Sequence, residues 1–295
     1  MSPRHVLLGV MVAIIWGANF VAIGVGLQDT PPLILLALRF VFVAFPLILF
    51  VRRPDASWWA IAGVGIFMSV GQFGLLYSAM ALGLPAGLAA VILQCQAAFT
   101  MLIAAIVLKE RPSRLQLAGA LVAVVGLAVV AIGRMDGALE FGVVVPVLVC
   151  AAGGLSWAIG NVIARTAPRA NGFSMVVWSA IFVPVPIMAL SLVFDGPTGI
   201  AEAFTTIGWQ TIASVAYTVI FASLIGYTIW NSLLRIYPAA RVAVFPLLAP
   251  PVAIVTAFIA FGEFPNALEI VGSALLIGGV ALGLLRRAVK QPAPA

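Results

Sequence analysis

Long apolar stretches, each of about 20 residues, follow one another along almost the whole sequence. A helix of this length crosses the hydrocarbon core of a bilayer, and only short loops separate the stretches. A soluble domain carries about 25% charged residues, whereas this chain carries 8% and is 64% hydrophobic. The sequence therefore predicts an all-α integral membrane protein. We expect ten transmembrane helices, at residues 6–26, 33–51, 58–80, 86–108, 115–133, 141–164, 173–194, 208–231, 239–261 and 267–285.

Positive charges are distributed unevenly between the loops on the two sides of the membrane. If the N-terminus is cytoplasmic, the cytoplasmic segments hold 13 of the 15 Lys and Arg residues. The opposite loops hold only Arg134, and the remaining residue, Arg39, lies within a span. Cytoplasmic loops are normally enriched in Lys and Arg, so we expect both termini to be cytoplasmic. This topology accounts for the net charge of +6, which does not indicate a nucleic-acid partner.

The sequence contains two copies of one unit. Residues 85–130 align with 238–283 at a constant offset of 153 without a gap. The matching pairs are Pro85 with Pro238, Ala86 with Ala239, Glu110 with Glu263, Pro112 with Pro265, Gly119 with Gly272 and Gly126 with Gly279. Each copy holds five predicted spans, and an odd number inserts the second copy from the opposite side of the membrane. We therefore predict an inverted repeat, with five-helix units at 1–138 and 139–290 and a disordered tail at 291–295.

An inverted repeat favours one class of membrane protein. Secondary transporters are often built this way, with a substrate site near the bilayer midplane between the halves. A channel would need a ring of carbonyls or charges in its pore, and a receptor or scaffold does not require the repeat. His5 is the only histidine, and no paired acids lie within the spans, so we predict no enzyme activity, metal site or cofactor.

Several motifs carry a resemblance to a known family. They are WGANF (16–20), ALRF (37–40), PAGLAAVILQCQ (85–96), KERPSRLQLAG (109–119), SWAIGN (156–161), VVWS (176–179), GYTIW (226–230) and GEFPNALEIVG (262–272). Through these motifs the chain resembles the EamA-type drug/metabolite transporter superfamily over nearly its whole length. The narrower ALRF, QCQ, SW-x-x-GN, VVWS and GY-x-IW set is similar to bacterial exporters of O-acetylserine and cysteine.

This resemblance implies a bacterial inner-membrane secondary transporter that exports small amino-acid metabolites by alternating access. Its partners would be the lipid bilayer and a small-molecule substrate similar to cysteine or O-acetylserine. Other cargoes stay open, namely aromatic or branched amino acids, purines, sugar-nucleotides and mixed toxic compounds or drugs. The coupling ion and the oligomeric state also stay open, and a monomer is compatible with the sequence.

Polar and central aromatic side chains within the spans are the candidates for substrate binding, because polar groups at membrane depth are costly and usually face protein or water. They are Asn19, Arg39, Gln72, Gln94, Gln96, Trp157, Asn161, Ser179, Tyr227 and Trp230. A guanidinium fits a carboxylate in two-point fashion, so Arg39 either holds a substrate carboxylate or anchors neighbouring helices. The amides of Asn19 and Asn161 either contact substrate or cross-link helices, and the aromatic rings either line a cavity or pack.

The segment VILQCQAAFT places two amides in an otherwise apolar span. At about 100° per residue, Gln94 and Gln96 fall at opposite edges of a face of small residues, and Cys95 falls on the apolar back of the helix. The second copy has Leu247 and Ala249 at the positions equivalent to the glutamines. The glutamines therefore distinguish the two halves, and we expect at least one of them to contact substrate.

Three prolines interrupt the ninth predicted span, at Pro246, Pro250 and Pro251. Each removes a backbone N–H donor, so this helix should be kinked or broken. Irregular backbone at membrane depth is tolerated only where protein or a water-filled cavity covers it. The prolines therefore predict a cavity wall and a hinge, or alternatively a static kink set by packing.

Two glutamates recur at the ends of equivalent spans. Glu110 and Glu263 each lie two positions before a proline. The predicted topology puts the two glutamates on opposite sides of the membrane. They either end their helices and pair with a neighbouring loop, or carry protons.

Overall fold

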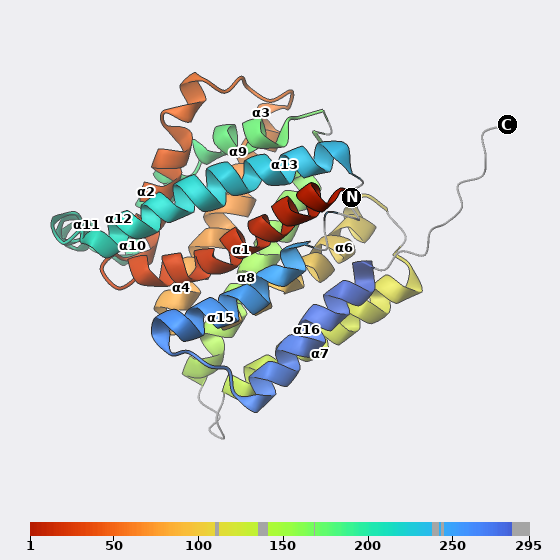
Figure 1. Cartoon of the computed structure of the whole chain (residues 1–295). Helices are drawn as coiled ribbons and strands as arrows, with labels where there is room; N and C mark the ends of the chain where they lie inside the picture. Colours follow the sequence, from red (N-terminus) through yellow and green to blue (C-terminus); the bar gives the residue numbers. More distant parts are fainter. Residues whose placement is uncertain (110–111, 135–140, 168, 238–241, 243–244, 285–295) are drawn as a thin grey trace.

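The structure, a computed structural model, describes residues 1–109, 112–134, 141–167, 169–237, 242 and 245–284. Helices make up most of this part of the chain, and no strand occurs in it (Figure 1). Most of the long helices run in one diagonal direction of the view, as expected for segments that share a membrane. The prediction of an all-α fold is confirmed.

The helices follow the predicted apolar stretches. In the first half they are α1 (Pro3–Gly26), α2 (Pro32–Ala44), η1 (Leu47–Leu49), α3 (Trp58–Val64), η2 (Gly65–Gly71), α4 (Gln72–Ala81), α5 (Ala86–Ile92), η3 (Leu93–Cys95), α6 (Gln96–Val107) and α7 (Arg114–Arg134). In the second half they are α8 (Phe141–Ala164), α9 (Gly172–Ala180), α10 (Pro184–Phe194), α11 (Gly196–Thr205), α12 (Trp209–Ala216), η4 (Tyr217–Ile225), α13 (Gly226–Ile236), η5 (Phe245–Leu248), α15 (Ala249–Phe261) and α16 (Ala267–Leu284). The segments η1, η3 and η5 are 3-10 helices, whereas η2 and η4 are π-helices.

Among the described residues, seven continuous helical stretches are long and apolar enough to cross a membrane. The pair α9 and α10 also passes this test, with a bend of 42° between the two helices. Phe245–Phe261 and Ala267–Gly283 are shorter apolar helices. Ten spans in an inverted arrangement stay a prediction. The helix α11 lies in a segment that we expected to be a loop.

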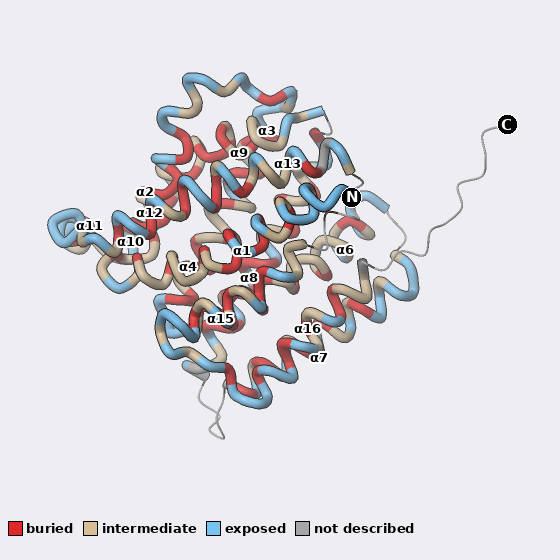
Figure 2. The backbone as a smooth tube through the Cα atoms, in the orientation of Figure 1, coloured by how far each residue is buried: buried red, intermediate tan, exposed pale blue. Residues whose placement is uncertain are grey.

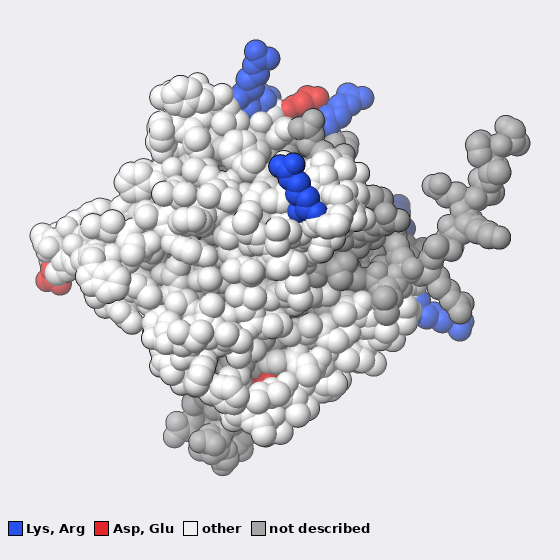
Figure 3. Space-filling model, viewed as in Figure 1, with Lys and Arg blue, Asp and Glu red and all other residues white. Residues whose placement is uncertain are grey.

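The outer surface of the bundle is apolar. Ile106, Val185 and Ile259 are 78%, 77% and 75% exposed, and Figure 2 shows the buried backbone concentrated inside the bundle. Soluble proteins rarely expose such extensive apolar surface, whereas a surface in contact with lipid is expected to do so. The Lys and Arg residues visible in Figure 3 lie in the upper and right-hand parts of this face.

The helices α1 and α8 lie in the middle of the bundle (Figure 1) and connect the two halves. The helix α1 packs along α15 and also contacts α12, η5 and α13. The helix α8 packs along α4, η2 and α6. The first helix of each half is therefore held by helices of the other half.

The helices α7 and α16 lie side by side along their length (Figure 1), and glycines allow their close approach. A Cβ atom on Gly119 would lie 2.5 Å from the carbonyl oxygen of Gly279, and one on Gly126 would lie 2.7 Å from that of Gly272. Small residues permit such contacts between helices in membranes. The offset of 153 relates Gly119 to Gly272 and Gly126 to Gly279. Each glycine of the first copy therefore packs against a repeated glycine of the second copy.

Replacing Gly279 with alanine should destabilise the protein. The new Cβ would meet the Gly119 carbonyl oxygen and the Ala123 nitrogen, both at 2.5 Å, and would force the helices apart. We expect a cost of about 1–3 kcal/mol, as for other overpacked sites. Gly278 is a matched control on the same helix, because a Cβ there meets no atom within 4 Å. Thermal unfolding in detergent should give a lower Tm for Gly279→Ala than for Gly278→Ala, and equal values would contradict the packing.

Candidate functional site

Two adjoining cavities lie inside the bundle and draw side chains from both halves. We name them the inner cavity, of about 350 Å³, and the outer cavity, of about 430 Å³. Nine of the ten predicted binding residues line the inner cavity. They are Asn19, Arg39, Gln72, Gln94, Gln96, Trp157, Asn161, Tyr227 and Trp230. The structure therefore brings together residues that lie far apart in the sequence, from α1, α2, α4, α6, α8, α13 and η3.

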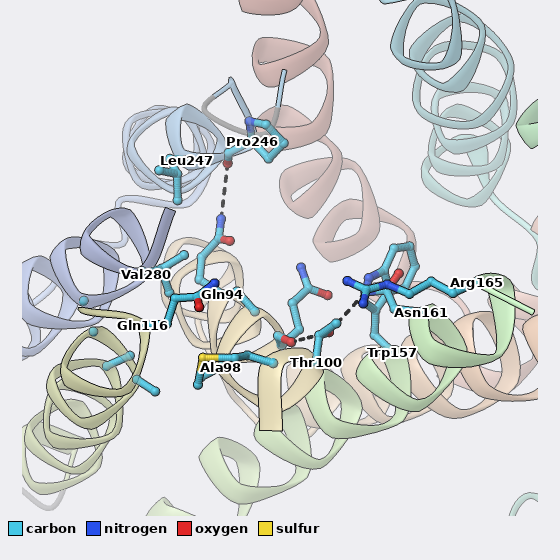
Figure 4. A pocket seen from close by; sticks show the side chains of 18 residues that line it. Gln94, Ala98, Thr100, Gln116, Trp157, Asn161, Arg165, Pro246, Leu247 and Val280 are labelled. Carbon is cyan, nitrogen blue, oxygen red and sulfur yellow. Dashed lines mark hydrogen bonds between the residues drawn. The ribbon is translucent and has the colours of Figure 1, made fainter. Parts of the chain in front are cut away.

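The outer cavity, whose lining side chains are drawn in Figure 4, adjoins the inner cavity and shares part of its wall. Both cavities are lined by Gln94, Gln96, Trp157, Asn161 and Pro246. The outer cavity then extends to Gln116 at the start of α7 and to the exposed Arg165 just beyond α8. A path lined by polar side chains thus leads from the middle of the bundle to its surface.

Ser179 is the predicted residue that the structure places elsewhere. It lines a side cavity of about 50 Å³, next to Arg39 and Tyr227, and not the inner cavity. Its Oγ donates a hydrogen bond to the carbonyl oxygen of Val176 at 3.2 Å within its own helix. Ser179 is therefore a neighbour of the inner-cavity residues, and a contact between it and substrate stays a prediction.

Arg39 on α2 is 2% exposed and lines the inner cavity. Its Nη1 donates to the Tyr77 hydroxyl at 3.4 Å, and its Nη2 donates to the Ser223 hydroxyl at 3.3 Å. The guanidinium carbon lies 4.2 Å from the centroid of the Phe73 ring. Its Nε has no hydrogen-bond acceptor within the described chain. A buried cation without a counter-ion is costly, so the position of Arg39 indicates a need for an anionic partner.

Asn19 and Gln72 present unpaired oxygens in the same cavity. Their side chains are 7% and 4% exposed, and Oδ1 of Asn19 and Oε1 of Gln72 accept no hydrogen bond from the described residues. Buried polar atoms are normally hydrogen-bonded. These oxygens are therefore acceptors available to a donor inside the cavity.

Aromatic rings form much of the remaining wall. The centroid of the Trp16 ring lies 5.4 Å from that of Tyr227 and 5.4 Å from that of Trp230. Phe73 packs edge-on against Trp157 with a centroid distance of 6.4 Å. Small-molecule sites typically combine such apolar walls with a few convergent polar groups, and this cavity has that composition.

Two π-helical segments position parts of this wall. The segment η2 ends immediately before Gln72, and η4 contains the wall residue Ala222. Side chains from the central helices donate to backbone carbonyls in these segments. Ser156 Oγ donates to the Phe67 carbonyl oxygen at 2.7 Å, and Trp16 Nε1 donates to that of Ala222 at 3.1 Å. Short π-helical segments within helices are frequent at functional sites, and here they flank the inner cavity.

The QCQ segment forms the 3-10 turn η3 and the start of α6. Gln94 Nε2 donates to the Pro246 carbonyl oxygen at 3.2 Å, and Figure 4 shows this side chain reaching toward Pro246. Gln94 and Gln96 line both cavities, whereas Cys95 is buried with its Sγ 4.0 Å from the Ala151 carbonyl oxygen on α8. The cysteine thus packs against a helix, while both amides face the cavities.

Asn161 also joins two helices. Its Nδ2 donates to Thr100 Oγ1 at 3.2 Å, and Thr100 Oγ1 donates to the Gln96 carbonyl oxygen at 2.7 Å (Figure 4). This chain connects α8 with α6 beside the cavity. Asn161 therefore cross-links helices and lines the cavity at once.

The prolines of the ninth predicted span lie where a 3-10 segment passes directly into an α-helix. Pro246 lies in the 3-10 segment η5 and lines both cavities. Pro250 and Pro251 lie in the first turn of α15, where a missing N–H donor costs little. Pro250 is buried and Pro251 is exposed. A kink or break of this span and a hinge at this point stay predictions.

Contacts between the halves join helices at the end of the bundle opposite the outer cavity. Thr30 Oγ1 lies 2.5 Å from Thr211 Oγ1, and both residues are buried. The backbone nitrogen of Ala86, at the start of α5, donates to Glu263 Oε2 at 2.9 Å. Glu263 thus pairs with the first turn of a neighbouring helix, one of its two expected roles. Its repeat partner Glu110 lies outside the described residues.

Sequence reasoning missed three residues of this region. Phe20 lines the inner cavity, Phe73 stacks on Arg39, and Ser223 accepts a hydrogen bond from Arg39. Phe20 directly follows Asn19, and Phe73 directly follows Gln72, so proximity to a polar residue in the span was the available signal. Ser223 carried no such signal, because a serine within a span is often bonded only to its own helix.

The sequence profile of the EamA-like transporter family matches residues 4–132 and again 145–285. A probable amino-acid metabolite efflux pump of Salmonella typhimurium is 38% identical over 99% of this chain and 99% of its own. A protein of Escherichia coli with the same description is 36% identical over 98% and 99%. A probable terminal-alkyne amino-acid exporter of Streptantibioticus cattleyicolor is 30% identical over 92% and 91%.

A solved structure, described only as the crystal structure of a protein, has a TM-score of 0.65 and covers 99% of this chain and 100% of its own. At 22% identity this likeness shows the fold alone. The family match and the full-length relatives confirm the resemblance seen in the motifs. The chain therefore belongs to the EamA-like transporter family, and it is a multi-pass membrane transporter and not an enzyme.

Proposed function

We propose that this transporter exports small amino-acid metabolites, of the size of cysteine or O-acetylserine, across the bacterial inner membrane by alternating access. The observation that carries the proposal is the inner cavity, which combines a buried cation, unpaired amide oxygens and aromatic walls from both halves. Secondary transporters built from inverted repeats bind their substrates near midplane between the halves. The nine predicted residues that line this cavity are the proposed substrate site.

The contacts between helices support the inverted five-plus-five arrangement. Exchanging the two repeat units at an offset of 153 converts the Gly119–Gly279 contact into the Gly272–Gly126 contact, and both are present. The π-helical segments Gly65–Gly71 and Tyr217–Ile225 overlap at the same offset. A twofold pseudo-symmetry that exchanges the repeats accounts for both observations with one offset. Without it, the shared offset of the glycine contacts and the π-helical segments would be a coincidence.

The cavity geometry supports an alternating-access cycle. The outer cavity opens at the end where the positive-inside rule places the cytoplasm, and the other end is closed by Thr30–Thr211 and Ala86–Glu263 contacts. This arrangement corresponds to an inward-open state, with both termini cytoplasmic. Opening toward the outside would separate these contacts and close the outer cavity. The proline-rich segment from Pro246 to Pro251, where the 3-10 segment meets α15, is the proposed hinge.

The size of the site and the relatives support an amino-acid cargo. Ligand sites typically enclose about 300–1,000 Å³, and the inner cavity lies near the lower limit. Two relatives are described as probable amino-acid metabolite efflux pumps and a third as a probable exporter of a terminal-alkyne amino acid. Aromatic or branched amino acids, purines and drugs are the alternative cargoes.

Transport in proteoliposomes tests this function. Purified protein should carry radiolabelled L-cysteine and O-acetyl-L-serine faster than protein-free liposomes, and varying the pH gradient and the membrane potential would identify the coupling. Movement of a purine or a drug, with no movement of any amino acid in a panel, would reject an amino-acid cargo. Movement of another amino acid alone would reject only cysteine and O-acetylserine.

A further inference from the structure

The inner cavity holds one positive charge without a described negative charge to balance it. The side chains that line it include Arg39 but no Asp or Glu of the described chain. The hydrogen bonds from Arg39 to Tyr77 and Ser223 measure 3.4 and 3.3 Å, beyond the usual limit of about 3.2 Å for N–H···O bonds. These long bonds to neutral hydroxyls orient the guanidinium but do not neutralise it, so an anionic group of the cargo would complete the site.

Asn19 and Gln72 supply the opposite chemistry to the same cavity. Their side-chain oxygens are buried acceptors without a donor among the described residues. An ammonium group carries only donors, and it is also attracted to the faces of Trp and Tyr rings. The rings of Trp16, Tyr227 and Trp230, which contact each other at a tilt, lie in this wall. A cationic group of the cargo therefore finds acceptors and ring faces in this wall.

We propose that the inner cavity binds its cargo as a zwitterion in one orientation. The carboxylate pairs with Arg39, and the ammonium group donates to Oδ1 of Asn19 and Oε1 of Gln72. This inference rests on the proposed function and adds that the charged groups shared by all α-amino acids are the part of the cargo that is recognised.

The arrangement selects one chemical class. A simple amine would place a second cation near Arg39, and a simple carboxylic acid would leave the oxygens of Asn19 and Gln72 buried without donors. A site built to hydrogen-bond a substrate group rejects an analogue that lacks the group, because its own polar atoms are then left unpaired. Only a molecule with both charges satisfies all three side chains.

The rest of the cavity leaves room for a variable side chain. Its wall at Gln94, Gln96 and Trp157 is shared with the outer cavity, so this side of the site is continuous with open space. A side chain that points this way is weakly constrained in length. We therefore expect tolerance toward the side chain of the amino acid together with strict selection for its two charged groups.

Competition by three related thiols tests this binding mode in proteoliposomes. L-cysteine has both charged groups, cysteamine lacks the carboxylate, and 3-mercaptopropionate lacks the ammonium group. Each competes with uptake of whichever radiolabelled amino acid the protein carries best. We expect L-cysteine to inhibit at a concentration about 10–100-fold lower than either analogue, as for hydrogen bonds between charged groups. The same comparison with L-phenylalanine, phenethylamine and 3-phenylpropionate extends the test to a larger side chain.

Two sets of variants separate the charged groups. In Arg39→Met, L-cysteine and cysteamine should inhibit at similar concentrations, whereas 3-mercaptopropionate should still require a higher concentration than L-cysteine. In the double variant Asn19→Leu with Gln72→Met, L-cysteine and 3-mercaptopropionate should inhibit at similar concentrations, whereas cysteamine should still require a higher one. Arg53→Met is the matched control, because Arg53 also stacks on an aromatic ring, Trp58, at 4.6 Å but lines neither cavity.

The outcomes distinguish the binding mode from the function. If amino acids are carried but the analogues compete equally in the unmutated protein, or Arg39→Met weakens all three thiols alike, the binding mode is wrong and the function stands. If no amino acid in the panel is carried, the proposed function fails and the binding mode fails with it. Because the ligand series uses unmutated protein, it decides the question even if Arg39→Met does not fold.

Discussion

Oxidation of a Thr30→Cys/Thr211→Cys variant should stop transport, lowering the rate by at least about tenfold, because closure and opening gate each cycle. The two hydroxyl oxygens lie 2.5 Å apart and belong to opposite halves. Cysteines at these positions would bring their sulfur atoms close to the bond length of a disulfide, about 2.0 Å. The disulfide would hold this end closed, and a transporter that cannot open on one side cannot release cargo there. Reduction with dithiothreitol should restore the rate measured before oxidation.

The controls for this experiment come from the same chain. Cys95 and Cys150 are buried free thiols and would be replaced with alanine in all variants. Thr30→Cys and Thr211→Cys alone should retain transport after oxidation, which separates the cross-link from the loss of either hydroxyl. Full transport by protein whose cross-link is verified by mass spectrometry would show that the halves do not separate at this end. Alternating access as proposed would then be wrong.

Much of the architecture could be predicted because it depends on local composition. A bilayer forces each apolar stretch to satisfy its own backbone hydrogen bonds, so length and hydropathy are enough to locate helices. Polar residues within spans are costly, and this cost explains why Asn19, Arg39 and Gln72 lie in one cavity. The repeat likewise relates Gly119 to Gly272 and Gly126 to Gly279, and these four glycines make the contacts between α7 and α16.

Other features depend on contacts between distant segments and could not be predicted from local pattern. The π-helical turn at Phe67 receives a donor from Ser156, which lies on a different helix in the other half. The 42° bend between α9 and α10 and the role of Ser223 beside Arg39 likewise depend on which helices meet. The depth of Ser179 in its predicted span favours a place among the cavity residues. Its helix turns the hydroxyl toward its own backbone instead.

A cysteine at Ala97 should react with a membrane-impermeant, positively charged methanethiosulfonate reagent from the cytoplasmic side only. Ala97 on α6 is partly exposed and lines the outer cavity, which opens at the end where the charge bias places the cytoplasm. The modification would leave a bulky cation on the path to a site that already holds Arg39. We expect the modification to lower the transport rate by about tenfold or more, since it blocks the entry of cargo from the cytoplasm into the inward-open state. Inside-out and right-side-out vesicles measure the two sides separately.

The position of the label also tests how the two ends are coupled. Cargo in excess should slow the modification of Ala97→Cys, because bound cargo favours the closing of the cavity around it. Ile106→Cys on the same helix is the control, since Ile106 is 78% exposed and lines neither cavity, so cargo should not change its rate of modification. Locking the opposite end through Thr30→Cys/Thr211→Cys should keep Ala97→Cys fully reactive while transport is absent. Reaction from the external side would reverse the proposed orientation, and loss of reactivity in the locked protein would mean that the two ends do not alternate.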